Sequence, residues 1–75
     1  MSKEDFLKLF AEQFDDTPEE LFTMDLKFKS LDEWSSLAAL SIISMIDDEF
    51  DKQITGADLR SVSTIGELYN LVENK

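Results

Sequence analysis

Apolar residues recur along this chain mainly at intervals of three and four, the spacing of one face of an α-helix. Near the amino terminus this apolar face comprises Phe6, Leu7, Phe10, Ala11 and Phe14. Ser2 precedes the stripe as a candidate N-cap, with Asp5 three residues later, and the polar pair Asp15-Asp16 follows it. We therefore predict a first helix between Ser2 and Asp15.

A second, longer stripe predicts a helix from about Ser36 to Phe50. Its apolar positions are Leu37, Leu40, Ile43, Ile46 and Phe50, widened by Ile42 and Met45. Ser35 precedes the stripe and is a plausible N-cap. No glycine follows Phe50, so Asp51 or Lys52 is expected to adopt the left-handed conformation that ends many helices.

Two shorter helices are predicted near the carboxyl end. The segment Thr55-Gly56-Ala57-Asp58 has the spacing of a capping box, and Ala57, Leu59 and Val62 would fill one short helix after it. Thr64 and Glu67 form a clearer capping box. The last helix follows with Ile65, Leu68, Tyr69, Leu71 and Val72 and ends at about Glu73.

The segment between the first two long helices lacks a sustained pattern. Thr17-Pro18-Glu19-Glu20 has the features of a helix start, with Thr17 as cap and Pro18 as the first helical residue. Residues 23–31 then predict a loop that turns Met24, Leu26, Phe28 and Leu31 toward a core. The expected fold is all-α: one domain over residues 1–75, a small four-helix bundle of three main helices and one short helix, with a long loop between helices 1 and 2.

Charge restricts the expected partners. The chain has 75 residues, and 17 acidic against 7 basic residues give a net charge of −10. Such a surface repels the phosphates of nucleic acids and anionic membranes and favours basic protein partners. No stretch approaches the roughly 20 apolar residues that span a bilayer, and the polar amino terminus has no signal-peptide core. We expect a cytoplasmic monomer that does not insert into membranes.

The composition also restricts chemistry. The chain has no cysteine and no histidine, which excludes thiolate chemistry and the usual zinc ligand sets. A catalytic serine would have no imidazole beside it. The acids from Asp47 onward have some of the rhythm of a calcium loop, but Lys52 stands where that loop needs glycine and Asp58 where it needs glutamate. We predict no catalytic residue and no metal site, and we expect Ser36 to be a residue that another protein modifies.

Three segments together resemble the acyl carrier protein family: Trp34-Ser35-Ser36-Leu37, Ile46-Asp47-Asp48-Glu49-Phe50 and Thr64-Ile65-Gly66-Glu67-Leu68. The resemblance extends over nearly the whole chain. It implies that Ser36 receives 4′-phosphopantetheine from coenzyme A through a magnesium-dependent phosphopantetheinyl transferase. It further implies a carrier without enzymatic activity, which shuttles thioester-bound acyl or aminoacyl groups in a pathway such as fatty acid, lipid or polyketide synthesis.

The chain departs from the family pattern at two places. The family has aspartate before the modified serine, whereas this chain has Ser35; two adjacent serines are thus candidates, and the register of Leu37 and Leu40 favours Ser36. Ala38, Ala39 and Ser41 stand where many fatty-acid carriers have acids. This nearly neutral helix start points to a specialised carrier, loaded by a dedicated acyl or aminoacyl ligase.

Six residues are expected to contact the transferase and the loading and processing enzymes through basic patches on those partners: Ser35, Leu37, Leu40, Met45, Asp47 and Asp48. Met45 could instead pack in the core, and the acidic cluster could be a solvated face. Trp34 is expected to plug the core, and Lys27 and Lys29 are expected to be solvated. The alternative function is an interaction module of the same fold that binds a basic partner and is never modified.

Overall fold

The computed structural model describes residues 2–75, and this part of the chain contains helices and no strand. Its elements are α1 (Lys3–Ala11), the 3₁₀ turns η1 (Glu19–Leu21) and η2 (Phe28–Ser30), α2 (Ser36–Phe50), α3 (Gly56–Arg60) and α4 (Ile65–Glu73). The predicted all-α fold, with three main helices, one short helix and a long connection between α1 and α2, is confirmed.

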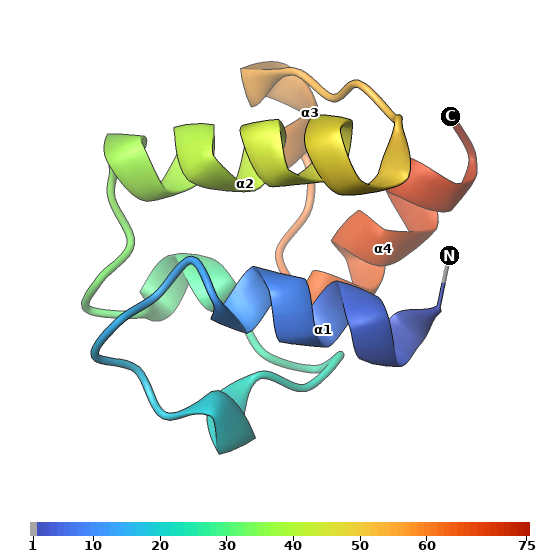
Figure 1. Cartoon of the computed structure of the whole chain (residues 1–75). Helices are drawn as coiled ribbons and strands as arrows, with labels where there is room; N and C mark the ends of the chain where they lie inside the picture. The colour runs from blue at the N-terminus through green and yellow to red at the C-terminus, as the bar shows by residue number, and fades with distance from the viewer. Residues whose placement is uncertain (1) are drawn as a thin grey trace.

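The helices pack pairwise around one core. Helix α1 contacts both α2 and α4, and α3 packs on α2. Figure 1 shows α1 and α2 running in opposite directions, with the connection between them wrapped around the end of α1 where that helix finishes. Both labelled chain ends lie on the opposite side of the molecule (Figure 1).

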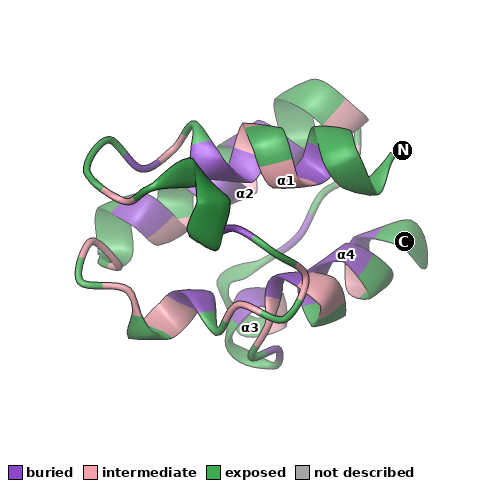
Figure 2. Ribbon diagram, turned by 90° about the horizontal axis from the view of Figure 1, so that it is seen from below, coloured by how far each residue is buried: buried purple, intermediate pink, exposed green. Residues whose placement is uncertain are grey.

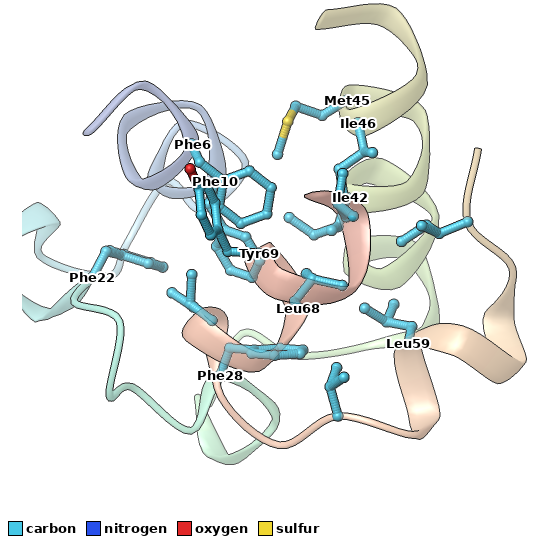
Figure 3. Packing of buried hydrophobic residues seen from close by; sticks show 14 of the residues in the cluster. Phe6, Phe10, Phe22, Phe28, Ile42, Met45, Ile46, Leu59, Leu68 and Tyr69 are labelled. Carbon is cyan, nitrogen blue, oxygen red and sulfur yellow. The ribbon is translucent and has the colours of Figure 1, made fainter. Parts of the chain in front are cut away.

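The core is built from apolar side chains of every helix and of the long connection. In α1 and α4 burial largely follows the predicted stripes. In α2 the prediction is wrong in part: Ala38, Ile42, Met45 and Ile46 form the buried face, whereas Leu37 and Leu40 are exposed. The helices turn their buried faces toward one another (Figure 2). Figure 3 shows Phe22 and Phe28 of the connection pointing toward the same centre as α1, α2 and α4. The largest fully buried side chains are Phe6, Phe10, Phe28, Ile42, Ile46, Ile65, Leu68 and Val72.

Helix α1 is shorter than its apolar stripe. It ends at Ala11, although Phe14 is still buried. The chain tightens at this point: the Gln13 N–H donates to the Phe10 carbonyl and the Phe14 N–H to that of Ala11, each three residues back. The Gln13 side-chain amide donates to the Leu9 carbonyl, which compensates the bond lost when the helix stops.

The helix start predicted at Thr17-Pro18 is wrong. Pro18 precedes a single 3₁₀ turn, and no side chain caps that turn. The Thr17 hydroxyl donates instead to the Glu33 carboxylate, which also accepts from the Asp16 N–H at 3.0 Å. The Thr17 side chain is thus bonded to a carboxylate near the far end of the connection, and its oxygen accepts no N–H of a first helical turn.

The other predicted caps are confirmed. The hydroxyls of Ser2 and Ser35 accept from backbone N–H groups in the first turns of α1 and α2. Complete capping boxes open α3 and α4, with Thr55 and Thr64 as their N-caps. Val62 lies beyond the end of α3, not inside it, and is still buried.

The first turn of α4 secures the long connection. The Ile65 N–H donates to the Leu26 carbonyl at 3.1 Å, and the Gly66 N–H to the Met24 carbonyl at 2.8 Å. A Cβ atom at Gly66 would lie only 3.0 Å from that Met24 oxygen. A residue without a side chain therefore lets the connection approach the helix closely.

Asp51 ends α2 in the left-handed region, with φ 54° and ψ 39°. Because glycine enters this region without the steric cost of a Cβ atom, Asp51→Gly should raise the free energy of unfolding by about 0.5–1 kcal/mol, measured by urea denaturation. Asp48→Gly removes the same charge inside the helix and should lower that free energy by about 1 kcal/mol. Equal effects of the two substitutions would contradict the assignment of strain to Asp51.

Asp58 links the capping box of α3 to the carboxyl end of α4. Its carboxylate accepts from the Lys75 ammonium at 2.8 Å and from the Thr55 N–H at 3.1 Å. The Lys75 hydrogen bond, followed by that from Thr55, holds the pKa of Asp58 below its ordinary value of 3.8. A depressed carboxyl pKa stabilises the fold above the ordinary pKa, and this stabilisation is lost as pH falls through the folded-state pKa.

Asp58→Asn should therefore lower the urea midpoint at about pH 7, and its difference from the unsubstituted protein should vanish toward about pH 2. Urea denaturation across this range measures both effects. Asp25→Asn removes an equal charge at an exposed position and should cause no loss at neutral pH. A deficit in Asp58→Asn that persisted at low pH would show that the cause is not the carboxylate charge.

Candidate functional site

The two adjacent serines at the start of α2 have different roles. Ser35 is the N-cap: its backbone is extended, and its hydroxyl accepts from the Ala38 N–H at 3.2 Å. Ser36 is the first residue of the helix and is exposed. Within residues 2–75 its hydroxyl makes no hydrogen bond. The free nucleophilic hydroxyl of the pair therefore belongs to Ser36.

Aromatic packing fixes the point at which α2 begins. Trp34 is half-buried, and its indole lies edge-on to the Phe28 ring with 5.0 Å between centroids. Phe28 in turn packs edge-on against Phe10 of α1, at 5.3 Å. The backbone N–H of Trp34 also donates to the Leu31 carbonyl at 3.0 Å. The residue two positions before Ser36 is thus anchored to the core, as expected for Trp34.

A pocket of about 340 Å³ lies between the start of α2, the turn η2 and α3, and Ser36 lines it. Its floor is apolar, with Trp34, Ala39 and Leu59. Two cationic residues, Lys29 and Arg60, complete the lining together with Ser35 and Gly56. No acidic residue of the described chain lines this pocket.

A second hollow, of about 670 Å³, lies between α1 and α2. Leu37 and Leu40 border it and are unusually exposed for large apolar residues, at 76% and 60%. Three acidic residues line the same hollow: Glu12, which follows the last residue of α1, and Asp48 and Glu49 of α2. We call this surface the acidic groove. It combines exposed hydrocarbon with negative charge and adjoins the residue that follows Ser36.

The residues predicted to contact partners are distributed unevenly over α2. Leu37, Leu40 and Asp48 border the acidic groove, together with Met45. Met45 is 5% exposed and belongs mainly to the core. Asp47 is exposed but does not line the groove, and the hydroxyl of Ser35 is engaged in the cap.

Sequence reasoning missed the cationic side of the site. Lys29 was expected to be solvated, but it is half-buried, and its ammonium donates to the Arg60 carbonyl at 3.1 Å. No sequence pattern indicates a role for Arg60, because it lies at the exposed end of a short predicted helix. The two residues are 31 positions apart, and only the folding of the long connection brings them together. No local pattern marks such a pair.

Nowhere in residues 2–75 do three or more histidine, cysteine, aspartate or glutamate side chains gather in a way that could hold a metal ion. None of the described helices has the length and apolar character needed to cross a membrane.

Comparison with known protein families gives one finding. The sequence model of a family described as "Phosphopantetheine attachment site" matches residues 4–72. The match covers α1 to α4 almost completely, including the start of α2 and the exposed hydroxyl of Ser36. This chain belongs to the phosphopantetheine-binding family of acyl carrier proteins, whose domain is the site of a covalently attached 4′-phosphopantetheine.

Proposed function

We propose that Ser36 is the attachment residue and that the protein carries acyl or aminoacyl groups between the enzymes of a biosynthetic pathway. The observation that supports this most directly is the division of work between the two serines. Ser35 caps α2, while the Ser36 hydroxyl is exposed and free at the first helical position. A separate transferase can therefore reach Ser36 without breaking a hydrogen bond of the fold.

In the proposed transfer, the Ser36 oxygen forms a bond to the phosphorus that bears the pantetheine part of coenzyme A. The bond between the two phosphates breaks, adenosine 3′,5′-bisphosphate leaves, and a base of the transferase takes the hydroxyl proton. The attached arm supplies a thiol on which acyl groups are held as thioesters. The residues of this chain present the hydroxyl and catalyse no step of the transfer.

The surroundings of Ser36 fit an anionic substituent. The first turn of α2 contains no acidic residue, and backbone N–H groups at a helix start together with the helix dipole favour negative charge. The uncharged Ser35 cap adds no repulsion. Replacement of the family's aspartate by serine thus preserves the cap and leaves the helix start free of fixed negative charge.

The acidic groove supports the docking part of the proposal. Exposed apolar patches rimmed by polar residues mark binding surfaces, and Leu37 and Leu40 are two exposed leucines one helical turn apart on the same groove. Leu37 would insert into an apolar hollow of a partner enzyme, and Asp48 and Glu49 would face basic residues around that hollow. We propose that the transferase and a dedicated acyl- or aminoacyl-loading ligase use this surface, in a pathway such as fatty acid, lipid or polyketide synthesis.

Enzymatic modification of the two serine variants tests which serine receives phosphopantetheine. Incubation with coenzyme A, magnesium and a broad-specificity phosphopantetheinyl transferase should add the mass of one phosphopantetheine to the unsubstituted protein, read by intact mass spectrometry. Ser36→Ala should abolish this gain. Ser35→Ala should retain it while lowering stability by about 1 kcal/mol through loss of the cap.

Modification of Ser36→Ala but not of Ser35→Ala would reverse the assignment. No mass gain in any variant, with a control carrier modified in the same tube, would favour the alternative function, an unmodified module that binds a basic partner. The Ser35 residue, which replaces the family's aspartate, is the feature that makes this alternative worth testing.

Leu37→Glu should lower kcat/KM of the transferase by about 10- to 100-fold, because it places a charge where an apolar anchor is expected. Leu21→Glu is the matched control: Leu21 is also an exposed leucine, at 47%, and it does not line the acidic groove. Steady-state modification rates measure the effect, and circular dichroism checks that both variants keep their helices. Equal losses in the two variants would remove the groove from the docking model.

A further inference from the structure

The pocket beside Ser36 has the opposite charge from the rest of the molecule. The chain carries a net charge of −10 and only 7 basic residues, yet two of these, Lys29 and Arg60, line this one pocket. No acidic residue of the described chain shares the lining. The acidic groove on the other side of α2 has the reverse composition, with three acids and no base. Helix α2 thus separates a cationic pocket from an anionic surface.

Lys29 is held at the pocket by contacts of the fold, and Arg60 reaches the pocket along its own helix. The Lys29 ammonium donates to the Arg60 carbonyl at the end of α3, and it lies 6.0 Å from the centre of the Phe28 ring. An ammonium has three donors, so this bond leaves two for a ligand. Arg60 extends along its own helix: a Cβ atom at Gly56 would lie 3.4 Å from its Nη1 atom. Neither cation forms a salt bridge within residues 2–75.

We propose that Lys29 and Arg60 bind the phosphodiester of the arm attached to Ser36 and hold the first part of the arm over the pocket between α2 and α3. This inference rests on the proposed attachment to Ser36. Arginine and lysine are the side chains that best bind phosphate oxygens. The phosphodiester would be bonded to a residue that itself lines the pocket, so its local concentration there is high.

The apolar floor fits the next part of the arm. Trp34, Ala39 and Leu59 line the pocket, are buried in or packed against the core, and offer hydrocarbon and an indole surface to the pantoyl methyl groups. The acidic groove, by contrast, would repel the phosphodiester. The charges of the chain thus direct the arm toward α3 and leave the groove open for enzymes.

The test compares the apo and the modified form of four proteins: the unsubstituted chain and the variants Lys29→Gln, Arg60→Gln and Lys27→Gln. Lys27→Gln is the matched control, because Lys27 is an exposed lysine of the same segment that does not line the pocket. Modification should raise the melting temperature at low salt in the unsubstituted protein and in Lys27→Gln. In the two pocket variants this gain should be smaller by about 2–5 °C.

Nuclear magnetic resonance supplies a readout that needs no substitution. The Arg60 Nε–H resonance should shift when the arm is attached. Sodium chloride at about 0.5 M should reduce this shift and should move the ³¹P resonance of the attached arm, because salt screens an exposed ion pair. Equal melting gains in all four proteins, together with an unchanged Arg60 resonance, would overturn the inference.

Two further outcomes separate this inference from the proposed function. The intact mass is measured before the melting and resonance experiments. If no mass gain is found, the proposed attachment itself is rejected. The arm can also be loaded directly from acetyl-coenzyme A or succinyl-coenzyme A, which differ by a terminal carboxylate. An Arg60 shift that appears only with the succinyl arm would assign the pocket to the cargo carboxylate and overturn binding of the phosphodiester.

Discussion

The structure depends above all on a continuous series of aromatic contacts through its core. Tyr69 of α4 meets Phe6 edge-on, Phe6 packs against Phe10, and Phe28 links Phe10 to Trp34, with 5.0–6.3 Å between successive ring centres. Truncating one buried phenylalanine typically costs about 3–5 kcal/mol, which is as much as a domain of this size has in total. The same rings that hold the helices together also place Trp34, and through it the start of α2. Folding and presentation of Ser36 therefore depend on one set of contacts.

The long connection is ordered without long helices of its own, because other elements form hydrogen bonds with its backbone carbonyls. The orphan N–H groups at the start of α4 bind its carbonyls at Leu26 and Met24, so each segment completes the hydrogen bonds of the other. Glu33 closes the connection on itself through Asp16 and Thr17. A mobile loop could not hold Lys29 against Arg60. Order in this segment is thus a condition for the cationic pocket.

Much of the fold could be predicted from sequence, because its signals are local. The caps at Ser2, Ser35, Thr55 and Thr64 each depend on residues within three positions. The error at Thr17 came from a contact across 16 positions, which local patterns do not contain. The same reason hid the pairing of Lys29 with Arg60. The register of Leu37 and Leu40 already favoured Ser36 over Ser35, and the geometry of the cap adds a physical reason for that choice.

The caps of the molecule differ in their sensitivity to acid. The cap of α3 uses the carboxylate of Asp58 as well as the Thr55 hydroxyl, and protonation of this carboxylate, whose pKa is lowered by the Lys75 hydrogen bond, removes part of the cap. The cap of α2 is the hydroxyl of Ser35, which has no charge to lose. Acidification would therefore loosen the start of α3 and leave the cap of α2 in place. A serine in place of a titrating cap keeps the start of α2 indifferent to pH, while the neighbouring start of α3 responds to it.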